Sequence, residues 1–92
     1  MSPAPPARIL TICNRRGLHA RSSAKFVKCV AEFDAEVKVK RDGQSVGGSS
    51  IMGLLMLGAA KGCNIEVSAE GPDAEAVLDV LEALVSSGFG ED

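Results

Sequence analysis

Two segments of this 92-residue chain alternate strictly between apolar and polar side chains. In residues 36–40 two valines alternate with charged residues, and in residues 64–70 Ile65, Val67 and Ala69 alternate with polar residues. Successive side chains of a strand point to opposite faces of its sheet. Each segment therefore predicts a strand with one buried face and one face in water, as in a sheet that is covered on one side only.

The neighbouring residues predict two more strands. Residues 9–13 form a short run rich in β-forming side chains. The Asp-Gly pair at 42–43 directly follows the first alternating segment, and such a pair favours the positive φ angles of a tight hairpin turn. Residues 44–46 are therefore predicted to return antiparallel to residues 36–40.

Three segments predict helices, because their apolar residues recur at helical spacing. Residues 50–57 are apolar almost all round, with Ser50 in the N-cap position and with Leu54 and Leu57 expected in the core. Residues 72–88 begin with Pro-Asp and end at a glycine. In residues 20–33 the expected core stripe consists of Ala20, Ala24, Val27 and Ala31, widened by Phe26, Val30 and Phe33.

The predicted order of elements is β-α-β-β-α-β-α. A four-stranded antiparallel sheet with three helices on one face buries the apolar strand faces, which is an α+β open-faced β-sandwich. Residues 1–7 contain three prolines and predict a flexible tail, because proline supports neither a strand ladder nor a helix. Residues 8–92 are predicted to form a single small domain.

The composition argues against several classes of protein. A net charge of −2 with no Trp or Tyr disfavours nucleic acid as a partner, since such domains carry basic excess or stacking aromatics. Cys13, Cys29 and Cys63 lie far apart and show no zinc-ligand spacing, so we expect free thiols and no metal or cofactor. No segment has the length of a membrane span or the pattern of a signal peptide. We expect a soluble, monomeric, cytoplasmic protein.

The single histidine, His19, stands directly before the first predicted helix. The first backbone N–H groups of a helix lack internal partners, and the helix dipole places positive charge there. Both disfavour an imidazolium, so we expect a neutral, nucleophilic ring. If the ring accepts a phosphoryl group, the N–H groups can bind its oxygens, with Arg21 from the first turn and Arg16 from the loop. A transient phosphohistidine suits this arrangement.

Other interpretations stay open on spacing alone. His19 and Ser50 can be ordinary helix caps, the serine cap being worth about 1 kcal/mol. A hydrolase is less well supported, because no acid lies near His19 in the sequence and a domain this small leaves little room for a deep pocket. A ferredoxin-like sensor of small molecules shares the βαββαβ order.

Two motifs carry a resemblance to a known family. Residues 17–21 read Gly-Leu-His-Ala-Arg, and residues 50–53 read Ser-Ile-Met-Gly, followed at 57–62 by Leu-Gly-Ala-Ala-Lys-Gly. In sequence and mutual separation these segments resemble the HPr/NPr family of histidine-containing phosphocarriers of the bacterial phosphotransferase system. The resemblance covers residues 8–88, and it implies an open-faced β-sandwich that acts as a phosphocarrier rather than as an enzyme.

The resemblance also implies roles for single residues. His19 would take a phosphoryl group on Nδ1 from phospho-Enzyme I and pass it to a histidine of an EIIA-type protein, while Arg21 steadies the group. Ser50 would be the regulatory position that HPr kinase/phosphorylase modifies. An alternative function is a regulatory interaction protein of the nitrogen-related branch, which binds partners according to its phosphorylation state. The sequence leaves open which branch the protein serves.

Ile51, Met52 and Leu55 of the second predicted helix are expected to stay partly exposed and, with Arg16, to dock partners. An exposed apolar patch that contains flexible methionine suits binding to several proteins. The chain departs from the family at Ser22, where the family usually has proline. Serine restores an N–H and adds a hydroxyl, so we expect a slightly looser, more polar cap and predict that Ser22→Pro keeps phosphate acceptance.

Overall fold

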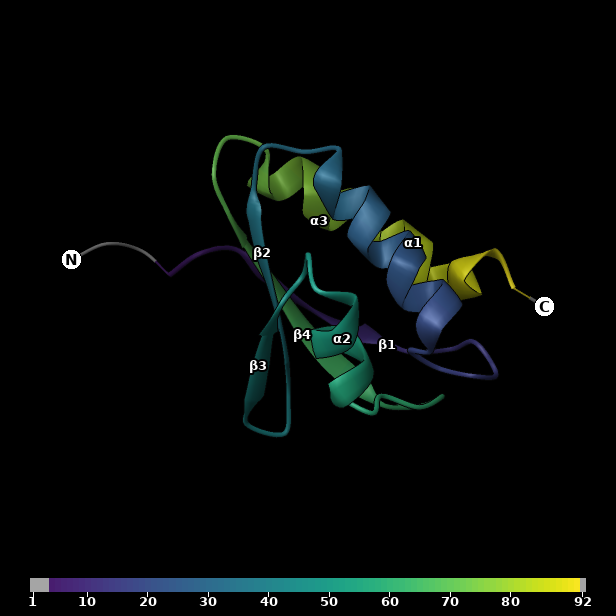
Figure 1. Ribbon diagram of the computed structural model, residues 1–92. Coiled ribbons are helices and arrows are strands. Elements are labelled where there is room, and N and C mark those ends of the chain that lie inside the picture. Colours follow the sequence, from purple (N-terminus) through teal and green to yellow (C-terminus); the bar gives the residue numbers. More distant parts are fainter. Residues whose placement is uncertain (1–3, 92) are drawn as a thin grey trace.

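The computed structural model describes residues 4–91, and within them the predicted order of elements is confirmed (Figure 1). The strands are β1 (Ala7–Thr11), β2 (Glu36–Arg41), β3 (Gln44–Gly47) and β4 (Asn64–Glu70). The helices are α1 (Ala20–Ala31), α2 (Ile51–Met56) and α3 (Ala74–Ser86), followed by a short 3-10 turn, η1 (Gly88–Gly90). The helices lie together on one side of the strands, as in the predicted open-faced β-sandwich (Figure 1).

The sheet is antiparallel throughout, with the strand order β1-β4-β2-β3. The hairpin between β2 and β3 pairs Arg41 with Gln44, and Asp42 and Gly43 form the turn with φ angles of 49° and 82°. Two positive φ angles in succession are characteristic of a type I′ turn. The Asp-Gly signal in the sequence therefore set both the turn and the register of this hairpin.

The first strand differs from the prediction in its bounds. β1 begins at Ala7 rather than at residue 9, and the carbonyl of Pro6 accepts a hydrogen bond from Ala69 at 3.1 Å. Proline has no N–H to donate, but its carbonyl still accepts, so pairing with β4 extends into the segment predicted as a tail. Residues 1–3 of that segment lie outside the described residues, and Ala7 belongs to the sheet.

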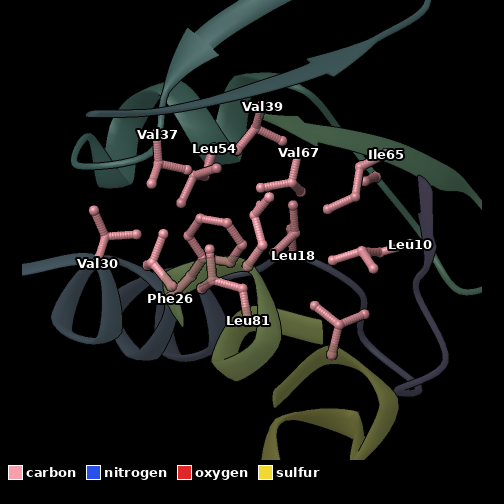
Figure 2. Packing of buried hydrophobic residues seen from close by; sticks show 14 of the residues in the cluster. Leu10, Leu18, Phe26, Val30, Val37, Val39, Leu54, Ile65, Val67 and Leu81 are labelled. Atoms are coloured by element: carbon pink, nitrogen blue, oxygen red, sulfur yellow. The ribbon is translucent and has the colours of Figure 1, made fainter. Parts of the chain in front are cut away.

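The core lies between the sheet and the helices. Val37, Val39 and Val67 point from the strands toward Phe26 and Leu81 of the helices (Figure 2). The alternating segments of β2 and β4 bury the residues that the sequence pattern predicted: Val37, Val39, Ile65, Val67 and Ala69. On the opposite face β2 and β4 carry polar side chains, and β1 carries the exposed Ile9.

The buried face of α1 corrects the predicted stripe. Ala20, Ala24 and Ala31 are exposed, whereas Ser22, Ser23, Phe26 and Val30 are buried. Packing of the large Phe26 and Val30 side chains against the core sets the rotation of α1, and the two small serines are buried because they lie on the same face. The helix also ends at Ala31, with Glu32 as its C-cap, and so is two residues shorter than predicted.

The other helices and β3 differ from the prediction only at their ends. α2 covers Ile51–Met56 with Ser50 as its N-cap, and α3 covers Ala74–Ser86. β3 runs one residue further than predicted, to Gly47. Leu54 and Leu57 are buried as predicted.

Candidate functional site

The loop between β1 and α1 brings His19 to the start of α1. Leu18 N–H donates to the carbonyl of Ala59 at 2.9 Å, which ties this loop to the segment after α2. Gly17 has a φ of +65°, and a Cβ at this position would lie 2.3 Å from the Ala59 oxygen. Only glycine fits both the backbone angle and the close approach. Gly17 therefore determines the path of the loop and with it the position of His19.

His19 is the N-cap of α1, and its ring faces the first turn of the helix. Its Nδ1 accepts a hydrogen bond from the backbone N–H of Arg21 at 3.2 Å. A ring nitrogen that accepts a hydrogen bond carries no proton, so in the neutral ring the proton is on Nε2. The geometry thus places the free lone pair of the imidazole on Nδ1, at the positive end of α1.

An acidic residue that sequence reasoning missed lies on the other side of the ring. Glu91 Oε2 is 2.9 Å from His19 Nε2, and Glu91 Oε1 accepts a hydrogen bond from Asn14 Nδ2 at 3.0 Å. The hydrogen bond from Asn14 is the main cause that lowers the pKa of Glu91; partial burial opposes it, and the bond to His19 adds to it. Glu91 is therefore a carboxylate that accepts a hydrogen bond from Nε2–H, which favours this tautomer of His19.

The backbone after α3 folds back to place Glu91. Phe89 is buried at a φ of +58°, next to Gly88 and Gly90, which also have positive φ. Lys25 Nζ of α1 donates to the carbonyl of Phe89 at 2.6 Å. A positive φ at phenylalanine is uncommon, so burial of its ring and this hydrogen bond hold the turn in place. No sequence pattern predicts a contact across the 72 residues between His19 and Glu91.

A surface hollow of about 330 Å³ opens beside the ring and is lined by Arg15, Arg16, His19, Arg21 and Glu91. Within residues 4–91 none of these three arginines forms a side-chain hydrogen bond or an ion pair. Their guanidinium groups therefore remain available to an anion, which they bind by charge-assisted hydrogen bonds. The structure brings both predicted arginines to His19 and adds Arg15.

Ser22 is fully buried in the first turn of α1. Its Oγ accepts the backbone N–H of His19 at 3.0 Å and donates to the carbonyl of Gly17 at 2.8 Å. The predicted polar character of this cap is therefore confirmed, while its predicted looseness stays a prediction. From the sequence we expected the hydroxyl to be a minor change, but it bridges the backbone groups of His19 and Gly17.

The second predicted site lies at the start of α2. Ser50 Oγ accepts the N–H of Gly53 at 3.0 Å, so the predicted N-cap is confirmed. Ile51 and Met52 are exposed to 38% and 68%, and Leu55 is half-buried, while Met56, which was not among the predicted docking residues, is exposed to 73%. The start and the outer side of α2 therefore present apolar side chains to solvent.

The described residues contain neither a cluster of metal-binding side chains nor a helix that could span a membrane. No group of three or more His, Cys, Asp or Glu side chains within residues 4–91 is placed to hold a metal ion. Cys13, Cys29 and Cys63 are free thiols. Among the helices of the described residues, none has the length and apolar character needed to cross a membrane.

Comparisons with known proteins agree on one family. The family model described as "PTS HPr component phosphorylation site" matches residues 7–87. The chain is 43% identical to the phosphocarrier protein HPr of Cupriavidus necator, over 91% of this chain and 94% of that protein. It is 45% identical to the phosphocarrier protein NPr of Escherichia coli K12, over 88% and 91%. The crystal structure of HPr-C-His from Thermoanaerobacter tengcongensis superposes with a TM-score of 0.91 at 38% identity, covering 95% of this chain and 98% of that one.

Proposed function

The chain belongs to the HPr/NPr family of phosphocarriers, and we propose that Nδ1 of His19 is the atom that carries the phosphoryl group. The observation that supports this most is the orientation of the ring. Nδ1 accepts the N–H of Arg21 at the start of α1, while Nε2 faces Glu91 at 2.9 Å. The unprotonated nitrogen is thus the one beside the helix N-terminus, where an anion is stabilised.

The transfer step follows from this arrangement. The lone pair of Nδ1 attacks the phosphorus of a donor phosphohistidine, and a new P–N bond forms as the donor's P–N bond breaks. Arg21 N–H then loses its acceptor on the ring and is free to bind a phosphoryl oxygen, beside the guanidinium groups of Arg16 and Arg21. Transfer to the acceptor is the reverse reaction with a different partner.

Glu91 has a role in the same step. Nε2 keeps its proton during the attack, so the ring gains positive charge as Nδ1 becomes bonded to phosphorus. The Glu91 carboxylate at 2.9 Å from Nε2 compensates that charge. The carboxylate does not need to take the proton, because a charge-assisted hydrogen bond is enough to stabilise the charged ring.

The proposed partners come from the family. The donor is phospho-Enzyme I and the acceptor is a histidine of an EIIA-type protein. Ile51, Met52 and Leu55 of α2, together with Arg16 beside His19, are proposed to form the surface that docks both. A small apolar surface with a flexible methionine suits a carrier that has to bind and release two partners in turn.

Ser50 is proposed as a regulatory phosphorylation site for an HPr kinase/phosphorylase, with Ser49 as the nearest alternative acceptor. Ser50 is exposed, and its Oγ caps α2. Phosphorylation adds close to two negative charges at a helix start, where they are tolerated locally. Next to the proposed docking surface the same charges repel an acidic partner, so we propose that phosphorylation weakens docking without unfolding α2.

A regulatory interaction protein of the nitrogen-related branch is the second candidate function. It is supported by the NPr of E. coli K12, which at 45% identity resembles the chain as closely as HPr relatives do. In this role the phosphorylation state of His19 or Ser50 controls binding to a partner.

Labelling with phosphoenolpyruvate and Enzyme I tests the proposal. The wild-type protein is expected to acquire a label that is stable in alkali and labile in acid, and His19→Ala is expected to acquire none. Ser50→Ala serves as the control and should label like the wild type. Label that persists in His19→Ala would refute the proposed carrier residue, and partner binding that His19→Ala retains would favour the regulatory function.

A further inference from the structure

We propose that Ser22 is a positioning residue for His19: its buried hydroxyl holds the His19 backbone so that Nδ1 faces the first turn of α1. The inference rests on the proposed function of His19. It concerns Ser22, which stands where the family usually has proline.

The Ser22 hydroxyl donates one hydrogen bond and accepts another, and both partners lie within five residues of it in the sequence. Its side chain has no exposed surface, and its Oγ accepts His19 N–H at 3.0 Å and donates to Gly17 O at 2.8 Å. The carbonyl of His19, at 3.3 Å, is a more distant alternative acceptor. A hydroxyl has one proton and two lone pairs, so it can donate to Gly17 and accept from His19 at the same time. Ser22 thereby fixes the backbone on both sides of Leu18.

The same hydrogen bonds continue to the other side of the imidazole. Gly17 O also accepts from Asn14 Nδ2 at 2.8 Å, and Asn14 Nδ2 donates to Glu91 as well. Glu91 in turn faces His19 Nε2. The connections form a closed circuit from the backbone of His19 through Ser22, Gly17, Asn14 and Glu91 to the His19 ring. In this circuit Ser22 bonds to the backbone of His19 and Glu91 bonds to its ring.

The hydroxyl replaces a restraint that proline would supply by different means. Proline restricts φ through its ring, whereas serine leaves the backbone free unless its side chain is bonded. In the first turn of a helix a serine side chain competes for backbone groups, and here it bonds to the two residues that orient His19. Removal of the hydroxyl alone should therefore loosen the ring while α1 stays folded.

Ser23 provides a matched control. It is the next residue of α1 and is also fully buried, yet its Oγ has no hydrogen-bond partner within the described residues. Ser22→Ala and Ser23→Ala each remove one buried hydroxyl from the same helical turn, and only the first removes hydrogen bonds to the His19 loop. Any general effect of volume or helix propensity appears in both variants.

Two measurements on both variants test the proposal. In the unphosphorylated protein, ¹⁵N NMR of the His19 ring is expected to report the Nε2–H tautomer in wild type and Ser23→Ala, and a mixture of tautomers in Ser22→Ala. In phosphorylation by phospho-Enzyme I, Ser22→Ala is expected to lower kcat about fivefold, with KM within about twofold, because the loss of its two hydrogen bonds disturbs the position of the ring and not the docking surface. Ser23→Ala is expected to match the wild type in both parameters.

The outcomes separate this inference from the proposed function. A Ser22→Ala protein with the wild-type ring spectrum and rate would overturn the positioning role, and so would an equal loss in both variants. If the wild-type protein took no label on His19 at all, the proposed function would fail instead. The ring spectrum of the unphosphorylated protein would still show whether Ser22 orients the ring.

Discussion

His19 and Ser50, the proposed carrier and regulatory residues, cap α1 and α2, and the two caps are built differently. His19 begins the 12-residue α1, and only 24% of its side chain is exposed, because Ser22 and Glu91 hold its backbone and its ring. Ser50 begins the six-residue α2, is exposed, and makes a single capping hydrogen bond to Gly53. The first cap therefore suits the proposed reaction on its ring, whereas the second is accessible to the proposed modifying enzyme. The difference suggests that a carrier atom needs fixed surroundings and that a regulatory hydroxyl needs access.

The largest effect is expected from the glycine that supports the first cap. Gly17→Ala adds a Cβ at 2.3 Å from Ala59 O on a backbone with φ of +65°, so the His19 loop has to move. We expect a loss of about 2–4 kcal/mol in the free energy of unfolding, measured with urea. Gly58→Ala is the control, because its φ of +62° is similar but nothing lies within 4 Å of the added Cβ. Equal losses in both variants would show that the close approach to Ala59 does not matter.

Removal of Arg21 should shorten the lifetime of a phosphoryl group on His19, the cap of α1, and should not affect the Ser50 cap of α2. Arg21→Ala deletes a guanidinium from the hollow beside His19, and the phosphohistidine is expected to hydrolyse about tenfold faster, as for the loss of one charge-assisted hydrogen bond. The half-life of the isolated phosphoprotein gives this directly. Lys28→Ala removes one positive charge from the last turn of the same helix and should leave the half-life unchanged. Equal acceleration in both would indicate a general charge effect.

Substitution of Ser50 tests the open cap. Ser50→Ala removes the hydrogen bond to Gly53 and should lower the free energy of unfolding by about 1 kcal/mol, as for other N-caps. Ser50→Asp keeps a capping acceptor and should retain stability, but its charge should slow phosphoryl transfer from Enzyme I. Thermal unfolding and transfer rates measured on both variants separate capping from docking. Rapid transfer by Ser50→Asp would argue against a docking surface beside Ser50.

The smallest effect is expected from the carboxylate behind His19. Glu91→Gln keeps the shape of the side chain but removes its charge, and the phosphorylation rate is expected to fall about threefold, less than for a full charge-assisted bond, because the pair is partly exposed to solvent. The pKa of Glu91 is below its ordinary value, mainly through the hydrogen bond from Asn14. Glu91 therefore stabilises the fold above its unfolded pKa, near 4.5, and this contribution disappears as the pH falls through the lower folded pKa.

Unfolding by urea between pH 7 and pH 3 checks the sign of this effect. The wild type should lose more stability than Glu91→Gln as the pH falls below about 4.5. A pH dependence that is the same in both proteins would show that the carboxylate is not held in solution as it is in the structure.

The parts of the fold that the sequence predicted are those set by local patterns. Alternation identified the strands β2 and β4, and the Asp-Gly pair identified the hairpin. The start of β1 depended on pairing with β4, which no local pattern contains. In α1 the pattern counted Ala20 and Ala24 as core, but Ser22 and Ser23 are buried instead, on the same face of the helix as Phe26 and Val30.

In the candidate site, too, only the residues that a local motif contains could be predicted from the sequence. His19 and Arg21 stand two residues apart in one motif, and the sequence itself predicted that a helix begins at Ala20, between them. Glu91 comes from a turn after α3 whose path depends on burial of Phe89 at positive φ. A contact set by a buried aromatic ring and a rare backbone angle leaves no periodic signal in the sequence.

The nitrogen that carries phosphorus provides the most direct test of the whole scheme. Wild-type protein labelled with ¹⁵N at histidine can be phosphorylated and its ³¹P–¹⁵N coupling measured by NMR. Because Nδ1 accepts the Arg21 N–H and Nε2 faces Glu91, phosphorus is expected on Nδ1 alone. Phosphorus bonded to Nε2, or found only on a serine, would contradict the assignment of His19 Nδ1 as the carrier atom.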